Sequence, residues 1–256
     1  MKRSSTKVEV GTCGFCMPQK DYFRCFKLIE IQQTFYQPPQ PKTVERWRRE
    51  APEDFIFTLK AFQAVTHPGT SPTFRRCKML SNEEKTECGF FRDNSTVRKA
   101  WWLTFELAQI LKAACVVFQC PAGFRPTDEH LNNMKCFFNW AERGSLIFCW
   151  EPRGAEWTEQ LVEELCQELE LVRVVDPLWE TVTDQFVYFR LHGSRDSKGR
   201  IVYSHHYSES ELLRLAKICS NRRGYVLFNN SAMKEDAVRF LHIQETLSQE
   251  NSQKNS

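Results

Sequence analysis

Hydrophobic residues along this chain gather in short runs that recur at regular intervals. Eight of these runs, rich in Val, Ile, Leu and Phe, are expected to be strands: 8–12, 28–32, 55–60, 115–119, 146–151, 172–176, 186–192 and 225–230. Runs of this length and composition are typical of strands that are buried on both faces. The pattern therefore predicts a sheet at the centre of the protein.

Segments with helical periodicity separate most of the expected strands. Helices are expected over 20–27, 41–49, 97–114 and 158–169, and from Thr127, Ser208 and Glu235 onward. Pro41 and Thr127 are favourable at helix starts, and Ser208 with Glu211 matches a capping box. Strands that alternate with helices pair in parallel, because parallel neighbours need crossover connections. Eight such units in 256 residues predict a single α/β domain, a (β/α)8 TIM barrel.

The expected barrel domain covers residues 1–247, and one long segment inside it breaks the regular alternation. Residues 67–96, after the third strand, carry Pro, Gly, Asn and charge without periodicity, which is typical of a lid or binding loop. Residues 248–256, rich in Ser, Gln and Asn, are expected to be a disordered tail.

An open, doubly wound sheet is the alternative fold, but Gly11-Thr12-Cys13-Gly14 is too short to be its phosphate-binding loop.

A charged residue in the second expected strand and another in the seventh are candidates for an internal contact. Glu30 lies in the second strand, and Arg190 lies in the seventh. A buried arginine requires a partner, because removing a lone charge from water is too costly. We expect Glu30 and Arg190 to meet in the barrel lumen, directly or through one neighbour. A purely structural role for Glu30 is at least as good an interpretation as a catalytic role.

Composition is that of a globular protein with a sizeable core: 41% hydrophobic residues, 26% charged residues and a formal net charge of +3. A charge this small gives no global basic field, so a nucleic-acid partner would need a local patch. No apolar run approaches the roughly 20 residues of a membrane span, and the start Met1-Lys2-Arg3-Ser4-Ser5-Thr6 lacks the apolar core of a signal peptide. We expect a cytoplasmic protein without a membrane partner, whose 11 cysteines are mostly reduced.

A polar or charged residue follows the apolar body of each expected strand. These residues are Thr12, Gln32, Lys60, Gln119, Glu151, Asp176, His192 and Asn229. In a TIM barrel the carboxyl ends of the strands meet at one rim, where the active sites of barrel enzymes lie. The sequence therefore predicts a functional pocket at this rim, although each residue taken singly could be a hydrogen-bonded part of the scaffold.

Four of these residues are candidates for catalysis. Glu151 and Asp176 close adjacent strands, so their carboxylates could act on one substrate as acid and base. Lys60 supplies a cation, and His192 supplies a group that titrates near neutrality. The expected substrate-binding residues are Gln32, Thr34, Tyr36, Gln119, Arg153, Arg190, Asn229 and Asn230. Among them, Arg153 lies just beyond the rim and suits an anionic group such as a phosphate.

The 67–96 segment also favours a different interpretation. It interleaves cations with aromatic rings, namely Phe74, Arg75, Arg76, Lys78, Lys85, Phe90, Phe91 and Arg92. Rings beside cations suit phosphate or single-stranded nucleic acid. The loop after the seventh strand adds the basic residues Arg195, Lys198 and Arg200. A solvated loop whose rings pack on the barrel mouth is the simpler explanation.

Metal binding is a further alternative. Four thiolates could close a structural zinc site, namely those of Cys13, Cys16, Cys77 and Cys88, but the second pair lacks the spacing of a zinc knuckle. A catalytic metal could be held by Glu151, Asp176, His67 and His192, but no His-x-His or Glu-x-x-His spacing supports it. We therefore expect no metal and no cofactor.

Seven different short motifs are distributed over nearly the whole chain. They are Val10–Gly14, Ile29–Tyr36, Thr43–Trp47, Lys60–Pro68, Val117–Pro121, Tyr188–Gly193 and Phe228–Asn230. Together they resemble the YecE-like family. The resemblance implies a barrel of the kind derived above and little about activity, because the family is a domain of unknown function. Two departures from the family pattern are the shortened turn Cys13-Gly14-Phe15-Cys16 and Gln32-Gln33 in place of the more usual Asn-Ser.

Three hypotheses about function follow. The leading one is an enzyme, a phosphodiester or sugar-phosphate hydrolase among the possibilities, whose rim pocket acts on a phosphate-bearing or nucleic-acid-derived substrate by carboxylate acid/base chemistry. The second is a non-catalytic nucleic-acid-binding module that uses the basic and aromatic 67–96 segment. The third is a metal-dependent phosphodiester hydrolase, because the barrel is broadly similar to the endonuclease-four and xylose-isomerase type of fold. The sequence leaves open which of these is right, and it leaves the oligomeric state open as well.

Overall fold

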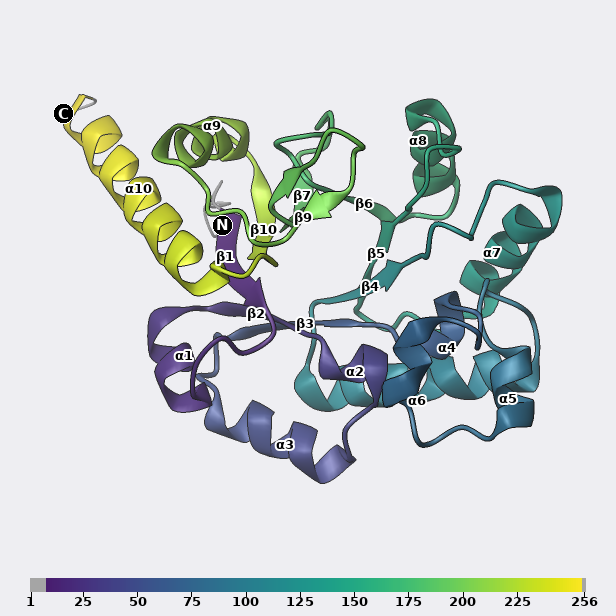
Figure 1. Cartoon of the computed structure of the whole chain (residues 1–256). Helices are drawn as coiled ribbons and strands as arrows, with labels where there is room; N and C mark the ends of the chain where they lie inside the picture. The colour runs from purple at the N-terminus through teal and green to yellow at the C-terminus, as the bar shows by residue number, and fades with distance from the viewer. Residues whose placement is uncertain (1–7, 255–256) are drawn as a thin grey trace. The chain divides into compact units, whose positions relative to one another are not determined.

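Eight parallel strands form a closed barrel in the computed structural model, which describes residues 8–254. Figure 1 draws the strands and helices, coloured along the chain. The strands are β1 (Val8–Cys13), β2 (Leu28–Ile31), β3 (Ile56–Lys60), β4 (Cys115–Gln119), β5 (Ile147–Glu151), β6 (Val172–Val175), β7 (Phe186–Leu191) and β10 (Arg223–Phe228). Their order around the barrel is β1-β10-β7-β6-β5-β4-β3-β2. All eight coincide with the strands that the hydrophobic pattern predicts, so the TIM-barrel expectation is confirmed.

The chain divides into two compact units. The first unit contains Met1–Ile29 and Val175–Ser256, and the second contains Glu30–Val174. The first therefore holds β1, β7 and β10, and the second holds β3, β4 and β5. The expected domain boundary at residue 247 stays a prediction.

In the first unit, β10 lies between β1 and β7. Val226 pairs with Val10 on one side and with Phe189 on the other. The helices of this unit are α1 (Gln19–Cys25), α9 (Glu209–Cys219) and α10 (Met233–Lys254). Helix α9 begins with the capping box that Ser208 and Glu211 predict: the Ser208 side chain accepts from the Glu211 backbone N–H, and the Glu211 side chain accepts from the Ser208 backbone N–H.

A tyrosine joins α1 to the strands of the first unit. The hydroxyl of Tyr22 accepts a hydrogen bond from the Thr12 backbone N–H at 3.0 Å and donates to the Leu28 carbonyl at 2.9 Å. The two strand segments approach so closely that a Cβ added to Gly11 would lie 2.1 Å from the Leu28 carbonyl oxygen. Only glycine fits at this position, because backbone atoms cannot move aside as a flexible side chain can.

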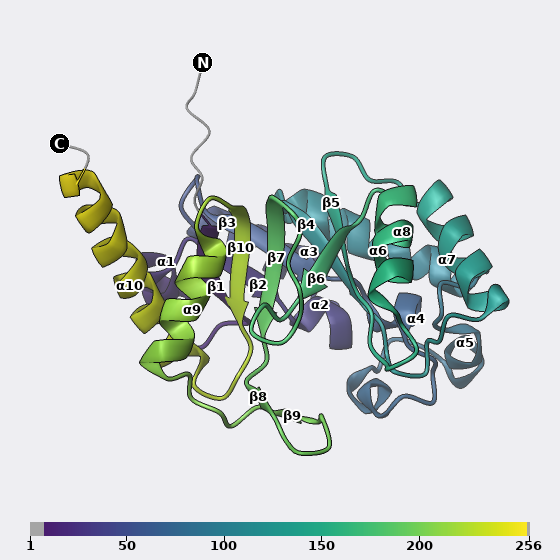
Figure 2. The ribbon, with the colours of Figure 1, turned by 90° about the horizontal axis from the view of Figure 1, so that it is seen from above.

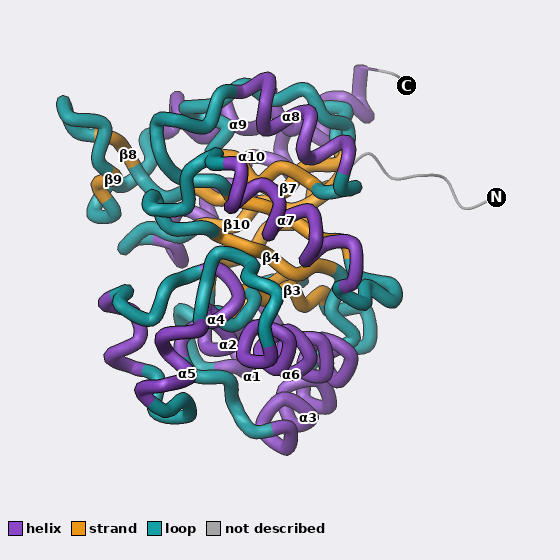
Figure 3. The backbone as a smooth tube through the Cα atoms, turned by 90° about the vertical axis from the view of Figure 1, so that its right-hand side faces the viewer, coloured by secondary structure: helices purple, strands orange, loops and turns teal. Residues whose placement is uncertain are grey.

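In the second unit, strands β3 to β6 carry an extensive aromatic core. Its helices are α2 (Gln33–Tyr36), α3 (Pro41–Glu50), α4 (Gln63–Thr66), η1 (Pro72–Arg76), α5 (Asn82–Glu87), α6 (Ser95–Leu111), α7 (Asp128–Trp140) and α8 (Glu159–Glu168). Figure 3 shows α3, α4 and α5 gathered around α6. The fully buried Trp101 of α6 packs on Phe118 of β4 and Phe148 of β5, with ring centroids 5.6 and 5.2 Å apart. These contacts fix α6 against the sheet.

The 67–96 segment is more ordered than its composition predicts. It contains η1 and α5, and α5 begins with a capping box between Ser81 and Glu84. Phe74 and Phe91 are buried, and Phe91 packs on Phe137 at 5.2 Å between ring centroids. Much of the segment therefore belongs to the packed body of the second unit, and a lid role for it stays a prediction.

Two connections depart from the regular alternation of strand and helix. Residues 176–185, all of them described, join β6 to β7 without a helix. After β7, a small antiparallel hairpin of β8 (Ser194–Arg195) and β9 (Ile201–Val202) precedes α9. Figure 2 shows this hairpin beyond the carboxyl end of β7. The hairpin was not expected, because a two-residue strand has no detectable periodicity. No helix was predicted between the sixth and seventh strands, in agreement with the helix-free connection.

The end of the chain also differs from the expected disordered tail. Helix α10 continues through residues 248–254, while residues 255 and 256 lie outside the described part of the chain. Ser, Gln, Glu and Lys can extend an existing helix at little cost, which composition alone does not reveal. Across the described residues, no helix has both the length and the apolar content that crossing a membrane requires.

The close approach at Gly11 generates a stability prediction. Gly11→Ala should lower the free energy of unfolding by about 3 kcal/mol or more, because the new methyl group would overlap the Leu28 carbonyl. Urea denaturation measures the change. Gly123→Ala is the matched control, since a Cβ at Gly123 has nothing within 4 Å. Equal stability of the two variants would contradict this close approach of the two strands.

Candidate functional site

Three polar side chains meet at the carboxyl ends of β3, β4 and β5 in the second unit. They are Lys60, Gln119 and Glu151, all of them predicted from their place at strand ends. Gln119 pairs in register with Glu151, and the Lys60 ammonium donates to the Gln119 side-chain carbonyl at 3.1 Å. Parallel pairing thus brings residues from three separate stretches of sequence to one place.

Glu151 forms an ion pair with Arg153. One oxygen of the carboxylate accepts from both Nη2 of Arg153, at 2.8 Å, and Nε, at 3.1 Å. The Glu151 side chain is 9% exposed, whereas that of Arg153 is 28% exposed. The guanidinium therefore compensates a nearly buried carboxylate and keeps part of its own surface open to a ligand.

Lys60 is buried against an aromatic ring. Its ammonium lies 3.7 Å from the centroid of the Phe35 ring, within the range of a cation–π interaction. Thr34 fixes α2 in this position, because its hydroxyl donates to the Lys60 carbonyl at 2.7 Å. Thr34 was predicted to bind substrate, but the contacts of its hydroxyl are structural.

His67 joins the same group of side chains. Its ring packs on Phe35 with centroids 4.9 Å apart, and Nδ1 pairs with the Thr66 hydroxyl at 2.8 Å. Burial, reinforced by the positive charges of Lys60 and Arg153, lowers the pKa of His67 to about 3. His67 is therefore neutral near pH 7, and it can donate or accept a hydrogen bond without adding charge.

Two other predicted residues lie at the two ends of α2, at the edge of this group. The amide of Gln32 donates to the Glu30 carboxylate. Tyr36 carries the Arg76 guanidinium over its ring at 5.1 Å, and its carbonyl accepts from Gln63 at 2.9 Å. Arg76 is exposed. We call the whole group the Lys60–Glu151 cluster, which consists of Tyr36, Lys60, His67, Gln119, Glu151 and Arg153.

A separate set of polar residues follows β6, β7 and β10 in the first unit. The Asp176 carboxylate accepts from the backbone N–H groups of His192 and Leu178, both at 3.2 Å. The ring Nδ1 of His192 pairs with the Asn229 side-chain amide at 3.0 Å. We call Asp176, His192 and Asn229 the Asp176–His192 cluster.

The Asp176 carboxyl has an unusual proton affinity. Burial raises its pKa to about 7, and the carboxylate of Glu180 adds to this effect. The hydrogen bonds from the backbone of His192 and Leu178 and the charge of Arg195 act in the opposite direction. Asp176 therefore exchanges a proton near neutrality, as an acid/base group must.

The remaining predicted residues of the first unit have structural contacts. Asn230 donates to the Asp236 carboxylate at 2.7 Å and to the His205 carbonyl at 2.8 Å, and so joins the end of β10 to α10. Arg190 is 1% exposed, and its Nη2 lies 3.7 Å from the Cys13 sulfur. Its expected partner, Glu30, belongs to the second unit, so that pairing stays a prediction.

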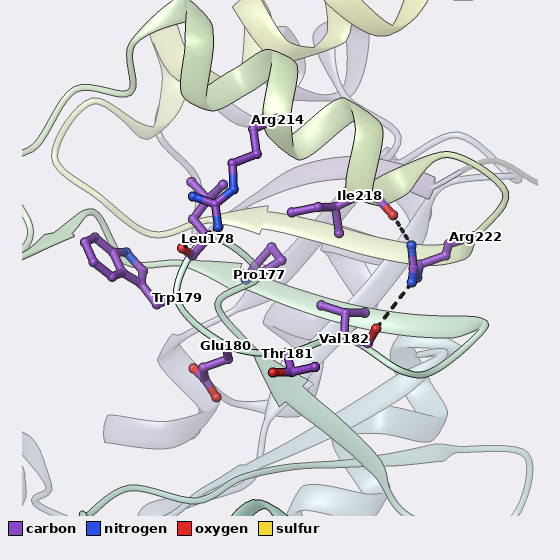
Figure 4. A pocket seen from close by; sticks show the side chains of 9 residues that line it. All are labelled: Pro177, Leu178, Trp179, Glu180, Thr181, Val182, Arg214, Ile218 and Arg222. Carbon is purple, nitrogen blue, oxygen red and sulfur yellow. Dashed lines mark hydrogen bonds between the residues drawn. The ribbon is translucent and has the colours of Figure 1, made fainter.

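A surface groove of about 480 Å³ lies where a helix would normally follow β6. It is lined by Pro177, Leu178, Trp179, Glu180, Thr181, Val182, Arg214, Ile218 and Arg222. Figure 4 shows Arg222 bridging the carbonyls of Ile218 and Val182, so that its charge is occupied in joining α9 to the 176–185 connection. Among these lining residues Glu180 is the only carboxylate, so the groove offers little chemistry.

The metal hypotheses gain no support from the geometry. Over residues 8–249, no three His, Cys, Asp or Glu side chains gather in a way that could hold a metal ion. This statement covers the four cysteines of the zinc hypothesis. It also covers Glu151, Asp176, His67 and His192, the residues expected to hold a catalytic metal.

Comparison with known proteins identifies the family. Residues 19–256 match the family described as "Protein of unknown function DUF72". The chain belongs to the DUF72 family. This confirms the resemblance to the YecE-like family, which is the same family. A search of curated proteins gives no match.

Solved structures of two DUF72 proteins resemble this DUF72 chain. One from Enterococcus faecalis V583 has a TM-score of 0.68 at 21% identity, and the alignment covers 94% of this chain and 98% of the other. One from Thermotoga maritima MSB8 has a TM-score of 0.68 at 19% identity, with coverage of 93% and 99%. Endonuclease IV from Thermus thermophilus has a TM-score of 0.54 at 12% identity, with coverage of 94% and 99%. A D-tagatose 3-epimerase-like protein has a TM-score of 0.53 at 14% identity, with coverage of 97% and 100%. These likenesses show the fold alone.

The raised pKa of Asp176 predicts a specific pH dependence of stability. The folded protein holds this proton up to about pH 7, whereas the unfolded chain releases it near the ordinary value of 3.8. Asp176 therefore contributes stability below about pH 4 that is lost as the pH rises through 7, with an upper bound of about 4 kcal/mol. Between pH 5 and pH 8, Asp176→Asn should lose markedly less stability than the wild type in urea denaturation.

Other titrating groups cancel in this comparison, because both proteins contain them. Glu180→Gln is the control: it should retain most of the pH dependence, since burial of Asp176 outweighs the charge of Glu180. Identical pH profiles for the wild type and Asp176→Asn would show that Asp176 ionises normally.

Proposed function

We propose that this DUF72 protein is an enzyme that binds the anionic group of a phosphate-bearing substrate and transfers a proton through a carboxylate in the Lys60–Glu151 cluster. The observation that carries the proposal is the burial of three ionisable side chains at strand ends. Taken as whole residues, Lys60, His67 and Glu151 are 4%, 5% and 7% exposed. Burying such groups costs stability that an apolar core would avoid, and they lie where barrel enzymes hold their active sites.

The roles of the residues follow from their contacts. Arg153 is suited to the anion, because its guanidinium is partly exposed and can bind a phosphate with a planar fork of N–H groups. Lys60 adds a second positive charge, and its stacking on Phe35 fixes that charge in place. A substrate phosphate would therefore meet two cations held by separate strand ends.

Glu151 is the proton-transfer group of the proposal. Its pairing with Arg153 favours the ionised carboxylate, which would act as the base. His67 stays neutral beside the two cations and would orient a hydroxyl of the substrate by a hydrogen bond. Gln119 holds the Lys60 ammonium and would set its direction toward the substrate.

The structural neighbours support the scaffold of this proposal rather than the reaction. Their names denote an endonuclease and a sugar epimerase-like protein, at 12% and 14% identity. A barrel that serves both kinds of protein is compatible with a substrate derived from nucleic acid or from sugar. The cations of the cluster, and not the neighbours, indicate the substrate class.

A non-catalytic nucleic-acid-binding module is the second candidate, and one observation favours it. The 67–96 segment does present Arg75, Arg76 and Lys78 to solvent. Its rings are less available, because Phe74 and Phe91 are buried in the body of the second unit. The segment thus offers cations for phosphate without the exposed stacking surfaces that single-stranded binding needs.

Single substitutions in the cluster test the enzyme proposal. A panel of sugar phosphates, nucleotides and inorganic phosphate is screened by thermal shift and calorimetry, and conversion of the ligands that bind is followed by phosphorus NMR. Arg153→Ala should weaken binding at least 10-fold. Glu151→Gln should retain binding and lose turnover by at least about 100-fold, because proton transfer contributes that much.

Glu168→Gln is the matched control for Glu151→Gln. Glu168 forms an ion pair with Lys135 at 2.8 Å, but its side chain is 51% exposed, away from the strand ends. This variant should leave binding and turnover unchanged. The proposal fails if no phosphate compound in the panel binds, or if Glu151→Gln turns over the bound compound at the wild-type rate.

A further inference from the structure

Two large aromatic rings are exposed beside the Asp176–His192 cluster of the first unit. Trp179 is 49% exposed and Tyr203 is 44% exposed, whereas most aromatic side chains of this protein are buried. Trp179 lies in the helix-free connection after β6, and Tyr203 follows the β8–β9 hairpin. Neither ring was singled out by the sequence, because nothing in the local pattern shows that it stays exposed.

Both residues are held in place rather than loosely attached. The indole N–H of Trp179 donates to the Gly193 carbonyl at 3.4 Å, and Figure 4 shows the ring at the end of the groove opposite Arg222. The Tyr203 carbonyl accepts from the Ser231 N–H at 2.7 Å. The Tyr203 ring stands edge-on to His192, with 6.1 Å between centroids. Fixed rings lose little conformational entropy when a ligand stacks on them.

The same region carries a small excess of positive charge. The hairpin and its turn hold Arg195, Lys198 and Arg200. Arg195 forms an ion pair with Glu180 at 3.6 Å and Arg200 forms one with Asp196 at 2.8 Å, so three cations less two acids leave one positive charge. The Arg195 guanidinium lies 5.9 Å from the centroid of the Trp179 ring, and the Arg200 side chain is 74% exposed. Cations next to stacking rings distinguish a nucleic-acid strand from a neutral sugar, because only the strand carries a phosphate for each base.

Hydrogen-bonding groups lie next to the rings. The paired side chains of His192 and Asn229 offer donors and acceptors of the kind that read the edge of a base. The Asp176 carboxyl is anchored through the backbone of His192. Rings, cations and edge-reading groups thus occur together on one unit.

We propose that Trp179 and Tyr203 form a stacking platform for unpaired bases of a single-stranded nucleic acid, whose phosphates contact the cations of the β8–β9 hairpin. This platform does not depend on the Lys60–Glu151 cluster, since every residue in it belongs to the first unit. It also replaces the 67–96 segment as the location of nucleic-acid binding, because here the rings are exposed.

Fluorescence anisotropy with labelled single-stranded oligonucleotides of about twelve residues, oligo-dT and oligo-U, tests the platform. Trp179→Ala and Tyr203→Ala should each weaken binding about 5-fold to 150-fold, the range for loss of one stacked base. Tyr203→Phe should bind like the wild type, since it keeps the ring. Replacing Lys198 and Arg200 by Gln should lower the slope of affinity against salt concentration.

Trp102→Ala is the matched control. Trp102 is 51% exposed on α6 of the second unit, so its removal deletes an equally exposed indole far along the chain from the platform. Binding should be unchanged in this variant and in Glu151→Gln, which separates the platform from the proposed enzyme chemistry. Thermal unfolding of each variant verifies folding.

Three results would overturn the platform. The first is equal affinity of Trp179→Ala, Trp102→Ala and the wild type. The second is a duplex bound as tightly as the single strand, because paired bases cannot stack on a protein ring. The third is an oligonucleotide bound no more tightly than its mononucleotide, which would assign the rings to a small ligand. If Tyr203→Ala does not fold, Trp179→Ala with Tyr203→Phe decides the question.

Discussion

In-register pairing of parallel strands is the constraint on which the Lys60–Glu151 cluster depends. Gln119 and Glu151 are neighbours only because β4 and β5 pair residue for residue, and Lys60 reaches Gln119 from β3 on the other side. A shift of one residue would turn these side chains to the opposite face of the sheet. The aromatic core around Trp101 and Phe118 fixes that register, so the stability of the fold and the position of the charged groups have one origin.

The two units shift the pKa values of their buried ionisable groups in different ways. In the second unit, two cations and burial act together on His67, which stays uncharged down to a pH of about 3. In the first unit, burial acts against two backbone hydrogen bonds on Asp176, and its pKa comes to about 7. Asp176 therefore binds and releases a proton near pH 7, whereas the His67 ring takes up its second proton only near pH 3. These residues therefore suit different tasks, proton transfer and orientation.

How much the sequence could predict depends on the length of each signal. Strands of four to six residues and capped helices repeat a pattern often enough to be found, which is why Lys60, Gln119 and Glu151 were identified at their ends. Phe35 was not identified, and His67 was considered only as a metal ligand, because α2 and α4 each span four residues and tertiary contacts decide how they turn. Exposure of Trp179 could not be foreseen either, since it results from a helix that is missing after β6.

The absence of a helix after β6 explains why the first unit exposes the groove and the Trp179 ring. A regular barrel would cover β6 and β7 with a crossover helix, and the 176–185 connection leaves the groove and the Trp179 ring open instead. The hairpin after β7 then adds Tyr203 and the cations of its turn. Connections tolerate such changes because they contribute few contacts to the core, while the strands that support them stay fixed. New recognition surfaces can therefore arise on this barrel without any change in the strand pairing that forms the Lys60–Glu151 cluster.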